Sequence, residues 1–97
     1  MSYAVFATIP LKPEHLDDAR TAIVAIVSQT RAEAGCEHFE PYRAADGSSN
    51  IYIFERWADR AAFDFHHAQD YTKNVFAKYE GWLRDDPKLV EVTELKD

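Results

Sequence analysis

The sequence predicts an α+β fold in which helices cover one face of a four-stranded antiparallel sheet. Its apolar patterns follow the order strand, helix, strand, strand, helices, strand. A chain of 97 residues is the size of one domain with a single core, and no linker or repeat divides residues 1–97. The strands are apolar on both faces, whereas the helices of so short a chain can cover only one face of the sheet.

The first strand is expected at residues 3–11 and the first helix from Pro13 to about residue 34. Residues 3–11 are apolar with β-branched members, and Pro13 suits the first turn of a helix. Gly35 is expected to end this helix in a left-handed conformation. One side of the helix carries apolar or small residues at helical spacing: Leu16, Ala19, Ile23, Ile26 or Val27, and Thr30. We therefore expect an amphipathic helix that packs on the sheet.

The second half of the chain predicts a hairpin, two helices and a last strand. Asp46-Gly47 is typical of the tight turn between two paired strands, expected at residues 36–44 and 50–57. Asp59 and Asp70 are each placed to cap a helix. The second of these helices repeats apolar residues at helical spacing: Val75, Phe76, Tyr79, and Trp82 or Leu83. With a strand over residues 88–95, the order is that of a ferredoxin-like split βαβ fold.

Strand 50–57 shows most clearly that both sheet faces are apolar. Ile51 and Ile53 point to one face, and Tyr52 and Phe54 point to the other. Since the helices cover one face, a second copy of the chain is the simplest cover for the other, and we expect a homodimer. The alternative is that a few aromatic side chains stay half exposed, as on many protein surfaces.

Composition and charge exclude several classes of partner and location. With 17 acidic and 11 basic residues, the net charge of −6 repels phosphate backbones and anionic lipids, so neither nucleic acid nor a membrane is expected as a partner. The single cysteine, Cys36, cannot form an internal disulfide, which fits a reducing compartment. The beginning of the chain lacks a signal-peptide pattern, and the longest aliphatic run, residues 22–27, is too short to span a membrane. We therefore expect a cytoplasmic protein.

Three segments carry a resemblance to a known family. Residues 31–36 end a helix with an acidic residue, a spacer and Gly-Cys; residues 54–57 end a strand with Glu-x-aromatic; residues 61–63 place Ala-Ala-Phe before His66. Taken in this order, they resemble the antibiotic biosynthesis monooxygenase family over nearly the whole chain. The resemblance implies a dimeric α+β barrel of ferredoxin-like protomers.

The same resemblance bears on cofactors. The family includes quinol and polyketide monooxygenases that use no metal or flavin, haem-degrading oxygenases and isomerase-like members, and fold alone does not choose among them. The haem-degrading members carry an Asn on the first strand, a Trp at the position of His66 and a His ten residues later. This chain has Ala7 and Thr8 on that strand and Phe76 ten residues after His66. We therefore expect no haem, and no other cofactor.

His66 and Tyr71 are the candidate catalytic residues. His66 follows Phe63 by one helical turn, so both side chains should face the sheet. An imidazole changes charge near neutral pH, which suits it to remove a phenolic proton; the alternative is a core histidine bonded to a carbonyl or carboxylate. Tyr71, where many family members have a second His, could orient or protonate an oxygen. His67 points about 100° away from His66 on the helix, so no metal site is expected.

Trp57, Phe63 and Phe76 are the candidate substrate-binding residues, because flat substrates are held mostly by apolar walls. The alternative is that they are ordinary core residues. Glu55 shares the strand face of Trp57; it either lines the cavity or joins a dimer through a partner arginine such as Arg43 or Arg56, and a structural role is favoured.

The function expected from these residues is a cofactor-free monooxygenase acting on a quinol or polyketide-like dihydroxyaromatic, with dioxygen as the second substrate. His66 would remove a phenolic proton, and the electron-rich anion itself would reduce dioxygen. Two alternatives stay open: a non-catalytic dimeric small-molecule-binding module, and an isomerase-like member of the same superfamily. The chain has no Gly-rich phosphate loop and no GxSxG motif, so nothing supports nucleotide-dependent or hydrolytic chemistry.

Overall fold

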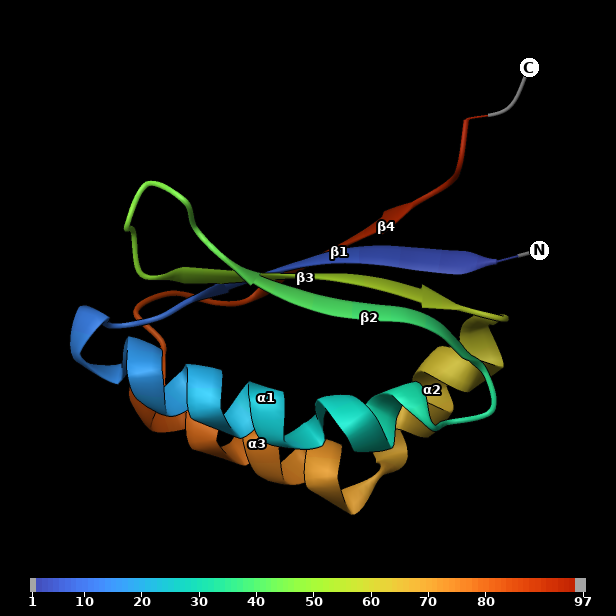
Figure 1. Cartoon of the computed structure of the whole chain (residues 1–97), viewed down its shortest axis with the longest axis horizontal. Helices are drawn as coiled ribbons and strands as arrows, with labels where there is room; N and C mark the ends of the chain where they lie inside the picture. The colour runs from blue at the N-terminus through green and yellow to red at the C-terminus, as the bar shows by residue number, and fades with distance from the viewer. Residues whose placement is uncertain (1, 96–97) are drawn as a thin grey trace.

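The computed structural model describes residues 2–95 and has the predicted order of elements (Figure 1). In chain order the elements are β1 (Tyr3–Pro10), the short 3-10 helix η1 (Pro13–His15), α1 (Leu16–Arg31), β2 (Cys36–Arg43), β3 (Asn50–Trp57), α2 (Arg60–Ala68), α3 (Asp70–Trp82) and β4 (Lys88–Val92). The strands lie in the sheet order β2-β3-β1-β4, and every neighbouring pair is antiparallel. The ferredoxin-like α+β protomer is therefore confirmed.

The sheet and the helices form two layers with the core between them. Figure 1 shows α1 and α3 side by side beneath the sheet, with α2 at the end where β3 finishes. From the helices, Ala19, Ile23 and Ile26 of α1 point into the core, as their spacing predicts. The strands contribute alternate residues to the same layer: Val5, Ala7, Ile9, Phe39, Ile51, Ile53, Glu55 and Trp57.

The predicted ends of the first helix need two corrections. Pro13 begins the 3-10 turn η1, and α1 itself runs only from Leu16 to Arg31. Gly35 is not left-handed: among residues 2–95 the only glycine with positive φ is Gly47, at 82° in the hairpin turn. Gly35 is needed for another reason, since a Cβ atom there would overlap the Cβ of Ala62 on α2. The glycine therefore permits close packing of α2 against the chain that follows α1.

Asp59 caps α2 as predicted, and its side chain accepts a hydrogen bond from the Ala62 amide at 2.8 Å. Asp70 does not cap α3: it is the first residue of the helix, and Gln69 occupies the cap position. An acidic residue in the first turn still interacts favourably with the helix dipole. The last strand is also shorter than residues 88–95, because its pairing with β1 ends at Val92.

The other face of the sheet carries large apolar side chains that no helix of the described chain covers (Figure 1). Phe6 on β1 is 53% exposed and packs on Phe54 of β3, with ring centroids 5.1 Å apart. Tyr42, Tyr52 and Val90 are also exposed on the strands of this sheet. We call these five side chains the open-face cluster. Within residues 2–95 no helix is long and apolar enough to cross a membrane.

Candidate functional site

The candidate site lies where α2 meets β3 and the end of α1. His66, on α2, is 3% exposed and points toward the sheet. The capping of α2 by Asp59 and the close approach of Ala62 to Gly35 hold this helix against the segment that carries Glu33. Local packing of α2 therefore fixes the position of the imidazole.

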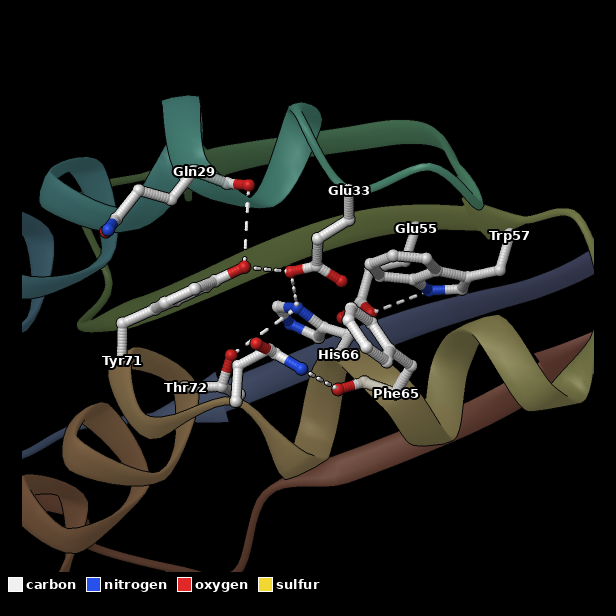
Figure 2. Close-up of polar contacts among 9 residues, drawn as sticks. Gln29, Glu33, Glu55, Trp57, Phe65, His66, Tyr71 and Thr72 are labelled. Carbon is white, nitrogen blue, oxygen red and sulfur yellow. Dashed lines mark hydrogen bonds and ion pairs between the residues drawn. The ribbon is translucent and has the colours of Figure 1, made fainter.

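One nitrogen of His66 is bound to a buried carboxylate. Nδ1 lies 2.9 Å from Oε2 of Glu33, and the two side chains are only 4% and 6% exposed (Figure 2). The Tyr71 hydroxyl donates a hydrogen bond to the same carboxylate oxygen. Thr72 Oγ1 lies 3.4 Å from Nδ1. Because Nδ1 faces a carboxylate, it holds the proton of the neutral ring, which leaves Nε2 with a free lone pair.

The ring of His66 lines a small cavity between the sheet and the helices. Within residues 2–95, Nε2 has no hydrogen-bond partner. The cavity has a volume of about 30 Å³, enough for a water-sized molecule. Its walls are mostly apolar and include Ala7, Ile9, Ile53, Val75, Phe76 and Leu89, with Glu55, His66, His67 and Thr72 among its polar members. The imidazole, whose Nε2 is unpaired, thus lines a small and mostly apolar space.

Trp57 packs on the imidazole from β3, and it is hydrogen-bonded to Glu55 of the same strand. The Trp57 indole stacks on the His66 ring with centroids 4.8 Å apart, and its Nε1 donates to Oε1 of Glu55 at 3.2 Å (Figure 2). Glu55 is 5% exposed. Burial raises the pKa of the Glu55 carboxyl to about 7, against the lowering effect of the Trp57 hydrogen bond, and the charge of Glu33 adds to the rise.

The structure decides between the two roles expected of Glu55, which were to line the cavity or to pair with an arginine of a second subunit. Its side chain faces the helical layer and lines the cavity, so it cannot reach across the open sheet face to a partner's arginine. Arg56 points the other way and pairs with Glu37 at 3.0 Å.

The predicted site residues fall into two groups. His66 and Phe76 line the cavity, and Phe76 is 40% exposed at its outer side. Trp57, Phe63 and Tyr71 do not line the cavity: Trp57 and Tyr71 lie next to the imidazole, Phe63 packs edge-on against Trp57, and the Tyr71 hydroxyl turns toward Glu33. Burial and the Glu33 hydrogen bond raise the pKa of Tyr71, so its hydroxyl remains protonated at neutral pH.

Glu33 and Thr72 are site residues that the sequence did not single out. Glu33 is 33 positions from His66, and nothing in the local pattern announces a contact over that distance. The only signal is its place in the segment 31–36 that carries the family resemblance. Thr72 lies one position after Tyr71 on α3, and helical spacing places it among buried residues.

Other titratable groups near the site offer less chemistry. Burial, with the nearby His66, lowers the pKa of His67, and burial raises the pKa of the Cys36 thiol to about 11. Cys36 therefore remains a thiol and is a poor nucleophile or metal ligand. Across residues 2–95, no three His, Cys, Asp or Glu side chains are grouped as a metal site would require.

Comparison with known proteins identifies the family of the chain. A family model described as "Antibiotic biosynthesis monooxygenase" matches residues 2–78. The Mycobacterium tuberculosis protein "Putative monooxygenase Rv0793" is 34% identical over 89 residues, which cover 92% of this chain and 86% of that protein. The Bacillus subtilis protein "Putative monooxygenase YcnE" is 28% identical over 91 residues, covering 94% of this chain and 95% of that protein.

Solved structures show the same fold. The structure of Rv0793 superposes with a TM-score of 0.91 at 28% identity, over 100% of this chain and 98% of that one. PA3566 from Pseudomonas aeruginosa gives a TM-score of 0.91 at 26% identity, over 98% and 95% of the two chains. The family match spans most of the sequence, including the segments that contribute Glu33, Glu55 and His66. The chain belongs to the antibiotic biosynthesis monooxygenase family.

Proposed function

We propose that this protein is a cofactor-independent monooxygenase that oxidises a quinol or a polyketide-like dihydroxyaromatic with dioxygen. The observation that carries the proposal is the asymmetry of His66. Its Nδ1 is held by the buried Glu33 carboxylate, while Nε2 has no partner among residues 2–95 and the ring lines a mostly apolar cavity. This is the arrangement expected of a general base that acts on a substrate hydroxyl.

Glu33 supports the base in two ways. Its carboxylate fixes the tautomer in which Nε2 carries the lone pair, and its charge stabilises the imidazolium that forms when Nε2 takes a proton. Both side chains are almost fully buried, so water screens this interaction little. The substrate anion produced by this transfer is electron-rich enough to reduce dioxygen itself, and therefore no cofactor is proposed.

Tyr71 acts in this proposal through Glu33. Its hydroxyl donates to the carboxylate oxygen that also binds His66. A protonated phenol at this place orients the carboxylate and limits its motion. Tyr71 is therefore proposed as a positioning residue, because its hydroxyl is turned away from the cavity that would hold the substrate.

The substrate is proposed to enter between α3 and β4. The present cavity is too small for an aromatic ring, but Phe76 and Leu89 line it and are 40% and 46% exposed. Side chains that are partly exposed can change rotamer at low cost, since they lose few packing contacts. Their displacement would join the cavity to the surface and place a flat ring near His66 Nε2.

A homodimer is proposed as the functional unit. The open-face cluster presents apolar side chains from β1, β2, β3 and β4 on a face that no helix covers. A second copy packed sheet to sheet would remove this surface from water, as in symmetric dimers generally.

Two observations favour a second candidate, a non-catalytic dimeric module that binds a small molecule. The cavity holds only about 30 Å³, and His66 is packed and hydrogen-bonded as a core histidine would be. In that case His66 would contribute to stability and not to turnover.

Dioxygen uptake on a panel of quinols and anthrones tests the proposed function. The informative variant is His66→Asn, whose amide can replace Nδ1 as the donor to Glu33 but has no group in place of Nε2. We expect turnover to fall by roughly 10²- to 10⁴-fold with the melting temperature nearly unchanged. The control is His15→Ala, which removes a partly exposed histidine of η1, before the start of α1 and at the opposite end of that helix from Glu33. A folded His66→Asn protein with full activity, or a wild-type protein that consumes no dioxygen on the panel, would refute the proposal.

A further inference from the structure

Glu55 is a buried carboxyl group without a cationic partner. It lies on the core face of β3, directly across from Val5 on β1 and Phe39 on β2, which are both buried. No ion pair joins it to a lysine, arginine or histidine in the part of the chain that the structure describes. A carboxylate in such apolar surroundings is costly, so the neutral acid is favoured.

The two oxygens of Glu55 have different environments. Oε1 accepts the hydrogen bond from Trp57 Nε1 at 3.2 Å, whereas Oε2 has no partner within residues 2–95. Because Oε1 accepts the hydrogen bond from the indole, it acts as the carbonyl oxygen of the neutral acid, and the proton belongs on Oε2. The carboxyl group lines the same cavity as His66, and both groups contact the same Trp57 indole (Figure 2).

We propose that Glu55 is the general acid of the oxygenation and delivers its Oε2 proton to the peroxide formed when dioxygen adds to the substrate. This inference rests on the proposed function and adds a second catalytic group to the cavity. His66 is paired with a carboxylate and suits the role of base, whereas Glu55 lacks a cation and suits the role of acid.

Together, His66 and Glu55 account for every proton that moves in the reaction. His66 Nε2 takes the phenolic proton, and a ring carbon of the anion that bears hydrogen forms a C–O bond with dioxygen, which gives a peroxide anion. Glu55 protonates the distal peroxide oxygen. The Glu55 carboxylate then removes the proton from that carbon while the O–O bond breaks, and the departing hydroxide takes the proton held on His66. The ring carbon becomes a carbonyl, one water forms, and both groups return to their starting states.

The surroundings of Glu55 keep a large share of it protonated up to about pH 7. Burial raises its pKa to about 7, and the charge of Glu33, in the segment that follows α1, works in the same direction. The other titratable groups packed around it are Cys36 on β2, His66 and His67 on α2, and Tyr79 on α3. The acid form is lost as the pH rises through about 7, so the rate limited by this proton should fall over the same range.

Glu55→Gln tests the inference, because the amide oxygen can still accept from Trp57 while the group can no longer give up a proton. We expect kcat to fall by about 10²-fold and the decrease of rate above pH 7 to disappear. Glu80→Gln, an exposed position on α3, is the matched control and should keep the wild-type profile. A purely structural Glu55 would instead leave kcat and the pH profile unchanged in the folded variant.

The outcomes separate this inference from the proposed function. If wild type oxidises a panel substrate and His66→Asn does not, full activity in Glu55→Gln overturns the role of Glu55 alone. If wild type oxidises none, the proposed function fails and the role of Glu55 fails with it. A carboxyl ¹³C NMR titration checks the acid without any substrate: a midpoint near 7 supports the role, and a midpoint near the ordinary value of 4.5 overturns it.

Discussion

At His66, two ring nitrogens on one side chain face different surroundings, and this difference underlies the proposed chemistry. Nδ1 meets the Glu33 carboxylate at 2.9 Å, whereas Nε2 has no partner within residues 2–95, on a ring that lines the cavity. The spacing of Phe63 and His66 predicts that the imidazole points toward the sheet, and the structure places it there. The partner Glu33 could not be predicted, because a pairing over 33 residues depends on how α1 and α2 pack.

Replacement of the partner carboxylate should weaken the base. In Glu33→Gln the amide is neutral, so it no longer stabilises the imidazolium formed during proton transfer. We expect kcat to fall by about 10²-fold or more with a smaller change in KM, measured by steady-state dioxygen uptake. Glu14→Gln, at an exposed position before α1, is the control. An unchanged kcat in Glu33→Gln would exclude this role.

Glu55 should also make stability depend on pH. Its pKa rises from 4.5 to about 7 on folding, so the unfolded state loses this proton first as the pH increases. The free energy of unfolding is therefore highest, as far as this group is concerned, below pH 4.5. It falls as the pH rises from 4.5 to about 7, by about 3 kcal/mol at most. Urea unfolding at a series of pH values should show this decline in wild type and in Glu80→Gln, and not in Glu55→Gln. Parallel curves for wild type and Glu55→Gln would contradict the assignment.

At the scale of the elements, strand and helix order follows from apolar periodicity, and β3 begins and ends where the pattern predicts. The ends of the helices are less predictable. Gly35 illustrates the reason: a glycine after a helix commonly adopts a left-handed conformation, but here it permits contact with Ala62 of α2. A requirement that arises from a neighbouring helix leaves no trace in the local sequence.

Gly35→Ala should therefore disturb the site through α2. The added Cβ overlaps that of Ala62 and must push α2 away, at a cost of about 1–3 kcal/mol in the free energy of unfolding. The displaced helix carries His66, so we expect turnover to fall as well. Gly81→Ala is the matched control: Gly81 lies in α3, a Cβ there meets nothing within 4 Å in the described chain, and the substitution should stabilise the helix slightly. Equal melting temperatures for the two variants would contradict the packing argument.

For the whole molecule, the sequence predicts two apolar sheet faces, and the structure shows that the helices cover only one of them. Phe6 and Phe54 remain partly exposed on the other face. The cavity was less predictable than the layers. Trp57 and Phe63 are aromatic residues at suitable positions, yet Trp57 stacks on His66, Phe63 packs on Trp57 and His67, and neither lines the cavity. Which aromatic side chains form a wall depends on rotamers and packing, and periodicity does not reveal these.

The open-face cluster should hold two copies together. Light scattering at micromolar concentration should give about twice 11.1 kDa for wild type. Phe6→Glu introduces a charge at the centre of the apolar face and should produce monomers. Phe65→Glu, at a similarly exposed position on the outer side of α2, should remain dimeric. A wild-type protein that stays monomeric at every concentration would exclude the dimer.

The most direct test of the account is the absorption spectrum of a quinol bound to the protein without dioxygen. Under these conditions oxygenation cannot proceed, and any proton transfer to His66 is visible as the red-shifted band of the substrate anion. We expect this band at neutral pH with wild type, and the spectrum of the neutral quinol with His66→Asn. A neutral spectrum with wild type, or the anion band with both proteins, would contradict the assignment of His66 as the base.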